Sequence, residues 1–177
     1  MSKNKQDASL AVLVSCALLA ALSIVLGKYL AIRVGDTMRF SFENLPILLA
    51  GMAFGAVPGV LVAVGADLIG CLLVGYPVNP LVTLGGAVIG LLGAVLFRVF
   101  AKAPNVVKVT ATVLLAHFVG SVLIKTVGLS AFYSYPLWEL MLWRLLNYAV
   151  VGAAESVLLY VILKNRAIQN QIGMIRR

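Results

Sequence analysis

Charged side chains are scarce in this 177-residue sequence: aspartate, glutamate, lysine and arginine together make up only 11% of it. The mean hydropathy is +1.06, and 62% of the residues are hydrophobic. A water-soluble domain of this size needs more polar side chains to cover its surface. The composition therefore excludes a soluble globular protein and predicts an all-α membrane protein.

Motifs for catalysis and metal binding are also missing. The sequence contains no Gly-x-x-x-x-Gly-Lys-Ser/Thr phosphate loop, no His-Glu-x-x-His motif and no Gly-x-Ser-x-Gly motif. Its single histidine, His117, has no second His or Cys at metal-ligand spacing, and Cys16 and Cys71 both lie inside apolar runs. We therefore expect a chain that is not an enzyme on its own, that uses no cofactor or metal, and that does not itself hydrolyse ATP by means of a phosphate loop.

Six apolar segments alternate with turns and are long enough, or nearly so, to cross a bilayer as helices. The predicted spans are residues 10–30, 42–54, 57–74, 80–100, 107–129 and 137–163. The second is short, which indicates a broken or tilted helix. We expect one domain over residues 1–177, a bundle of six transmembrane helices with short tails at about 1–8 and 165–177.

Basic residues at the ends of the chain and around one loop predict the orientation of this bundle. Lys3 and Lys5 precede the first span, Arg98, Lys102 and Lys108 bracket the loop between the fourth and fifth spans, and further basic residues end the chain. The positive-inside rule assigns all of these to the cytoplasm, so both termini are expected there. The segments 31–41, 76–79 and 130–136 then converge on the outer side.

Five cations lie in or beside apolar segments near that outer side, and they are the main functional signal. They are Lys28, Arg33, Arg39, Lys125 and Arg144. A charge at membrane depth is costly unless it faces water, a partner or a ligand. Because these cations are divided among apolar segments, the net charge of +8 does not indicate nucleic-acid binding. The sequence predicts unpaired cations around an outer pocket for an anionic solute.

Arg144 is the strongest candidate for a ligand contact. Asn147 and Tyr148 follow it at i+3 and i+4, so the three side chains can share one side of a helix. An arginine fork matches a carboxylate, and an amide offers both a donor and an acceptor. The alternative for Arg144 is an internal ion pair with Glu139, Asp67 or Glu155. For Asp67 and Glu155 themselves, a structural bridge to a neighbouring group is at least as good an interpretation as a functional role.

Other candidates lie close to the same outer ends. Lys125 either contacts the ligand or extends to the membrane interface. Tyr76, in a proline-rich turn, is the first choice among the outer aromatic side chains for stacking on a planar ring. The candidate substrate-binding set is Arg33, Arg39, Tyr76, Asn79, Lys125, Arg144, Asn147 and Tyr148.

Small residues recur at four-residue spacing, which lets helix backbones approach closely in lipid. Gly51, Gly55 and Gly59 form one such row, and packing within the bundle is the preferred interpretation for it. Ala17 and Ala21 share one face of the first span and serve either the bundle or a partner protein.

Several stretches resemble the substrate-binding S components of energy-coupling factor (ECF) vitamin transporters, in particular their folate branch. The matching runs are residues 31–47, 49–59, 66–70 and 76–84, together with the sixth span from Trp143 to Glu155. The resemblance implies a six-helix subunit in a prokaryotic cell membrane. It also implies a transmembrane T component, with Ala17 and Ala21 at the interface, and two ATPases as partners. A folate-like ligand is expected, and an S component for pantothenate or another vitamin, or a membrane scaffold with no transport role, are the alternatives.

Overall fold

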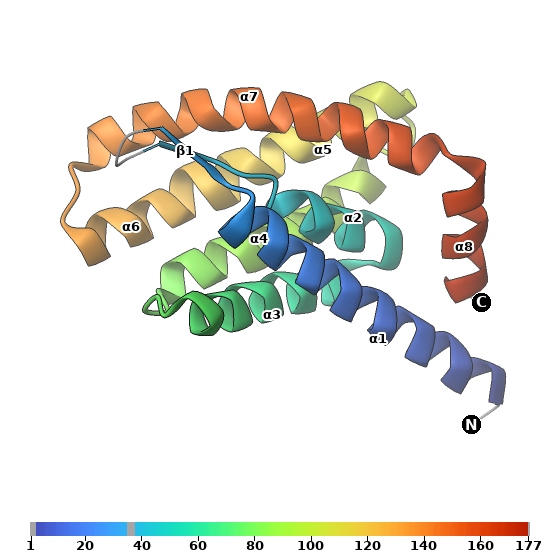
Figure 1. The fold of residues 1–177 in the computed structure, drawn as a ribbon. Coiled ribbons are helices and arrows are strands. Elements are labelled where there is room, and N and C mark those ends of the chain that lie inside the picture. Colours follow the sequence, from blue (N-terminus) through green and yellow to red (C-terminus); the bar gives the residue numbers. More distant parts are fainter. Residues whose placement is uncertain (1–2, 35–37, 177) are drawn as a thin grey trace.

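The computed structural model describes the backbone of residues 3–34 and 38–176, and the side chains of residues 9–32 and 39–173. Figure 1 shows long helices running side by side, with a short hairpin across one end and a short helix at the other. In chain order the elements are α1 (Lys3–Ile24), η1 (Val25–Tyr29), β1 (Ile32–Val34), β2 (Met38–Phe40), α2 (Asn44–Phe54), α3 (Ala56–Val74), α4 (Pro80–Val99), α5 (Asn105–His117), η2 (Phe118–Ile124), α6 (Lys125–Tyr133), α7 (Leu137–Lys164) and α8 (Arg166–Arg176).

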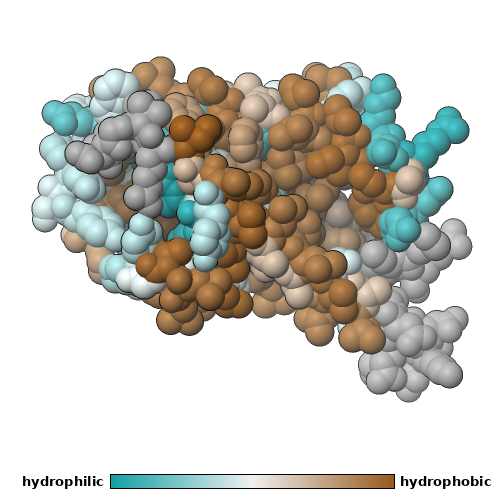
Figure 2. All heavy atoms as spheres, viewed as in Figure 1, coloured by the Kyte–Doolittle hydropathy of each residue, from teal (hydrophilic) through white to brown (hydrophobic). Residues whose placement is uncertain are grey.

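Five helical segments in the described chain are long and apolar enough to cross a membrane: Ser9–Tyr29, Ala56–Val74, Pro80–Val99, Asn105–Tyr133 and Leu137–Lys164. α2 is apolar too, but its 11 residues extend only about 16 Å, which is half of a hydrocarbon core. Figure 2 shows a broad hydrophobic band in the middle of the visible face, with hydrophilic side chains toward both ends. The protein is therefore a multi-pass membrane protein, and the predicted helical bundle is confirmed.

Glycines allow α2, α3 and α4 to pack with their backbones in contact. A Cβ added at Gly51 would lie 2.5 Å from the carbonyl oxygen of Gly90, and one at Gly59 would lie 2.6 Å from the same atom. No side chain fits at such distances, so these positions require glycine. The prediction that the row containing Gly51 and Gly59 serves packing within the bundle is confirmed.

Two segments of π-helix interrupt the first and fifth spans. η1 continues α1, and η2 joins α5 to α6. In η2 the backbone N–H of Lys125 donates to the carbonyl of Gly120, five residues earlier. The carbonyl of Ser121, the usual α-helical acceptor for this N–H, accepts from the side chains of Thr126 and Arg144. Such π-segments often occur at functional sites.

Two elements were not predicted. β1 and β2 pair antiparallel, with Arg33 opposite Arg39, where only a loop was expected. Residues 166–176, predicted as part of a tail, form the helix α8, which packs against α1 and α7. The hairpin is the element that brings Arg39 to the site described next.

Candidate functional site

A cavity of about 250 Å³ opens beside the hairpin, and we call it the hairpin cavity. Its walls come from β2 and the segment after it, from α4 and α6, and from α7. The lining residues are Arg39, Ser41, Glu43, Val82, Lys125, Leu129, Tyr133, Tyr135, Leu140, Arg144 and Tyr148. Three cations, one carboxylate, three tyrosines and a few apolar side chains make a cavity suited to an anion with a flat ring.

Glu43 links two of the cations. Its Oε1 lies 3.2 Å from Nζ of Lys125, and its Oε2 lies 3.6 Å from Nη2 of Arg39. Lys125 also donates to Oδ1 of Asn44 at 3.3 Å. Both cations therefore share a single acidic partner, and the cavity keeps an excess of positive charge. The prediction that all the cations are unpaired is wrong for Arg39 and Lys125, because Glu43 lies between them.

Arg144 contacts no carboxylate in the part of the chain that the structure describes. Its Nε donates to the carbonyl of Ser121 at 3.1 Å, which is the carbonyl released by η2, and its Nη2 lies 3.5 Å from the hydroxyl of Tyr148. The proposed acidic partners are engaged or distant: Asp67 accepts from Thr83, Glu155 contacts His117, and Glu139 is exposed. The alternative of an internal ion pair for Arg144 is contradicted.

Lys125 is 5% exposed, so the alternative in which it extends to the interface is also wrong. Its stem fits against α4 because residue 85 is glycine. A Cβ at Gly85 would lie 2.5 Å from Cγ of Lys125 and 2.6 Å from the carbonyl oxygen of Gly120. A lysine at this depth is tolerated because Glu43 and Asn44 satisfy its ammonium group.

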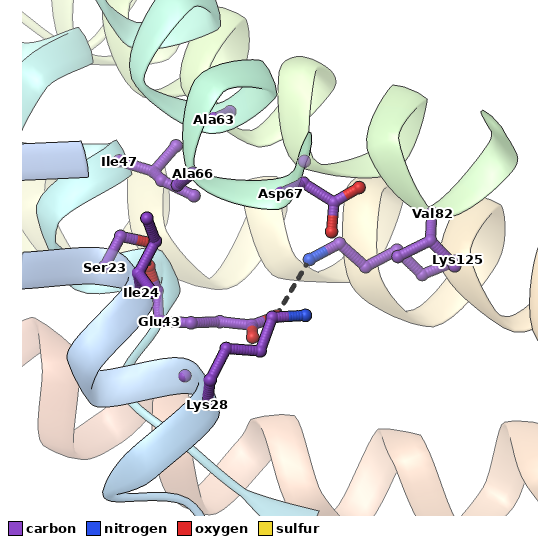
Figure 3. Close-up of a pocket in the computed structure, with 12 residues that line it drawn as sticks. Ser23, Ile24, Lys28, Glu43, Ile47, Ala63, Ala66, Asp67, Val82 and Lys125 are labelled. Atoms are coloured by element: carbon purple, nitrogen blue, oxygen red, sulfur yellow. Dashed lines mark hydrogen bonds and ion pairs between the residues drawn. The ribbon is translucent and has the colours of Figure 1, made fainter. Parts of the chain in front are cut away.

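A small inner pocket of about 30 Å³ lies behind the Glu43–Lys125 pair (Figure 3). It shares Glu43, Val82 and Lys125 with the hairpin cavity, and its other polar walls include Lys28 and Asp67. This volume suits a water molecule rather than a vitamin. The ion pair therefore forms the floor of the larger cavity.

Asp67 belongs to a local polar cluster. Its Oδ2 accepts from the hydroxyl of Thr83 at 2.5 Å, and its Oδ1 lies 3.8 Å from Sγ of Cys71. Lys28 reaches the same sulfur at 3.7 Å. These contacts agree with the structural interpretation of Asp67, which joins α3 to α4.

Asn147 supports the cavity from behind. Its Nδ2 donates to the backbone carbonyl of Arg39 at 2.8 Å and so ties α7 to the hairpin. Its Oδ1 is buried and has no hydrogen-bond partner among the described groups. Asn147 therefore positions Arg39 in this structure, and it is not part of the cavity lining.

Asn79 and Tyr76, two further predicted site residues, do not line the cavity. Asn79 caps α4, because its Oδ1 accepts from the N–H of Leu81 at 3.0 Å, and its Nδ2 donates to the carbonyl of Gly128. Tyr76, in the turn before α4, lies with its ring 5.9 Å from Nζ of Lys28. The side chain of Arg33 lies outside the described residues, although its backbone faces Arg39 across the hairpin. Their ligand roles stay predictions.

Glu43, Tyr133 and Tyr135 line the cavity but were not among the predicted site residues. The sequence carried a signal for Glu43, an acid directly before an apolar helix in a chain with few acids. The two tyrosines belong to the outer aromatic side chains, among which Tyr76 is the one predicted to stack on a ring.

His117 forms a buried network behind the cavity. Its Nε2 contacts Oε2 of Glu155 at 2.5 Å, and its ring stacks on that of Tyr148 at 4.8 Å between centroids. Both members of the pair are almost fully buried. His117 is therefore a hydrogen-bonded core residue, and Glu155 is its partner.

The family model described as "ECF transporter, substrate-specific component" matches residues 11–171. Among curated protein sequences, no significant match is found.

Solved structures share the fold. They include FolT bound with folic acid, which is 19% identical in sequence and matches with a TM-score of 0.66. The match covers 84% of this chain and 88% of the FolT chain. ThiT from Listeria monocytogenes is 16% identical and has a TM-score of 0.63. That match covers 94% of this chain and 98% of the ThiT chain. An S component for biotin is 20% identical and has a TM-score of 0.58. That match covers 100% of this chain and 93% of the biotin S component.

Proposed function

This chain belongs to the family of ECF transporter substrate-specific components, and from that premise we propose that it binds folate in the hairpin cavity for uptake into the cell. S components are the substrate-binding subunits of transporters and are not enzymes. Family membership contradicts the alternative of a scaffold with no transport role. The identity of the vitamin is inferred from the residues that line the hairpin cavity.

The observation that carries the folate proposal is the pairing state of Arg144. Its guanidinium lines the hairpin cavity and meets a carbonyl and a hydroxyl, but no carboxylate among the described side chains. A folate molecule carries two carboxylates on its glutamate tail, and each charge-assisted hydrogen bond to such a group contributes about 1.5–3 kcal/mol. Arg39 and Lys125, which share one acid, supply further positive charge.

The rest of the cavity suits the flat part of folate. Tyr133, Tyr135 and Tyr148 offer aromatic faces for stacking, and Glu43 offers an acceptor for ring N–H groups. The fold is shared with a FolT that was solved with folic acid, which supports the choice. Pantothenate is the second candidate. Its one carboxylate suits the cations, but it has no ring to stack on the tyrosines.

The proposed partners are a transmembrane T component and two ATPases, in a prokaryotic plasma membrane with both termini of the chain in the cytoplasm. Ala17 and Ala21 lie exposed on α1 in the isolated chain, which leaves them available to the T component. The cluster of basic residues at the opposite end from the hairpin cavity supports this orientation.

Identification of the compound retained by the protein tests the vitamin assignment. The chain is purified in mild detergent from cells, without added ligand, and the small molecules released on denaturation are identified by mass spectrometry. We expect one folate per chain. Retention of pantothenate or of a vitamin without carboxylates would contradict the folate assignment but would leave the family membership unaffected.

A further inference from the structure

A second cavity, of about 390 Å³, lies at the other end of the bundle, where α4 ends, α5 begins and α7 ends. We call it the lysine cavity because Lys108 and Lys164 line it. The other lining residues are Met52, Ala53, Phe97, Asn105, Val109, Tyr160, Leu163, Gln169, Ile172 and Gly173. The transport function proposed above does not use this cavity.

Among the described side chains, the two lysines have aromatic neighbours but no acidic ones. Nζ of Lys108 lies 3.7 Å from the centroid of the Phe97 ring, and Nζ of Lys164 lies 5.6 Å from that of Tyr160. Neither ammonium forms an ion pair with any side chain in 9–32 or 39–173, and no carboxylate lines the cavity. Two such cations around one cavity favour an anion.

An apolar groove of about 350 Å³ adjoins the lysine cavity. It lies between α1, α2 and α8, and its walls include Leu18, Leu49, Phe54 and Ile168. Ala53 of α2 and Ile172 of α8 line both spaces, so the cavity and the groove meet where these two helices border them; α8 is the helix at the right of Figure 1. The combined site is charged at one end and apolar at the other.

We propose that this combined site binds an anionic phospholipid. The phosphate lies between Lys108 and Lys164, Asn105 and Gln169 can donate to headgroup oxygens, and an acyl chain fills the apolar groove. Paired cations at the edge of a helical bundle recognise anionic headgroups, and the surrounding bilayer supplies the ligand. A soluble phosphate would use the lysines but would leave the groove without a function.

Lipid selectivity tests this proposal. The full chain in mild detergent is incubated with equal amounts of 1-palmitoyl-2-oleoyl phosphatidylglycerol and the corresponding phosphatidylcholine, and bound lipid is counted by native mass spectrometry. We expect the wild type to prefer phosphatidylglycerol about tenfold, which corresponds to about one charge-assisted contact. The double variant Lys108→Gln, Lys164→Gln loses that preference. The matched control Lys102→Gln, an exposed cation at the same end that does not line the cavity, keeps it.

Four results would overturn the proposal. The first is a wild type without preference, and the second is an equal loss in Lys102→Gln, which would show diffuse attraction only. The third is displacement of the lipid by glycerol phosphate at equal concentration, which would identify a site for free phosphate. The fourth is a double variant that keeps its lipid selectivity but no longer co-purifies with the ATPases, which would assign the cavity to a protein partner. Folate binding at the hairpin cavity serves as the check on folding and is expected to be unchanged in all variants.

Discussion

Replacing Arg144 with alanine is expected to weaken folate binding by at least about tenfold, the loss of one charge-assisted hydrogen bond. Arg144 is the cavity cation without an acidic partner in the described structure, so its charge is the one most available to a ligand carboxylate. The bundle is expected to stay folded, because the carbonyl of Ser121 still accepts from Oγ1 of Thr126 and Tyr148 lines the open cavity. Calorimetric titration of the purified variant measures the change.

The matched control for this variant is Arg98→Ala. Arg98 is an exposed arginine near the end of α4, whereas Val82, near the start of the same helix, lines the hairpin cavity. The loss of Arg98 is therefore expected to leave folate affinity unchanged. Wild-type affinity in Arg144→Ala would remove this residue from the site. An equal loss in both variants would show that net charge alone matters.

Replacing Gly85 with alanine is expected to weaken folate binding and to lower stability by about 1–3 kcal/mol, a usual cost of overpacking. The new methyl group would lie 2.6 Å from the backbone oxygen of Gly120, so η2 must move. That displacement shifts Lys125, the first residue after η2, and the Ser121 carbonyl that accepts from Arg144. One methyl group therefore disturbs two of the cavity cations. Thermal unfolding and folate calorimetry on the same sample report the two effects.

Gly65→Ala is the matched control, because a Cβ at Gly65 meets no other atom within 4 Å. The same substitution in the neighbouring helix α3 is expected to leave both stability and binding near wild-type values. If Gly85→Ala binds folate as tightly as the wild type does, the close contact between α4 and η2 does not position the cations.

The membrane-spanning helices could be predicted from the sequence because their apolar runs have the length that a bilayer requires. The predicted fourth span, 80–100, differs by one residue from α4, where Asn79 and Pro80 start the helix by capping and by a fixed φ angle. The hairpin could not be predicted, since two strands of three residues leave no recognisable alternation. α8 carried a weak signal, with Ile168 and Ile172 one turn apart in a polar segment.

The cations of the cavity could be predicted from charge in or beside apolar segments, and Arg39, Lys125 and Arg144 all line it. Arg144 and Tyr148 lie one helical turn apart, and both line the cavity as expected. Glu43 pairs with Lys125 across 82 positions of the chain, and no local pattern reveals such a partner. Asn79 and Asn147 were assigned to the ligand from their polarity, but in a membrane a buried amide equally serves to satisfy backbone groups, and here they bind the carbonyls of Gly128 and Arg39.

The central claim, that positive charge in the hairpin cavity recognises the carboxylates of the vitamin, is tested most directly with a neutral analogue. Calorimetric titration of the wild-type chain compares folate with its diamide, in which both tail carboxylates are converted to amides and the ring is unchanged. The account predicts that folate binds at least about tenfold more tightly, because the amides lose the charge-assisted contacts. Equal affinity for the two compounds would contradict it.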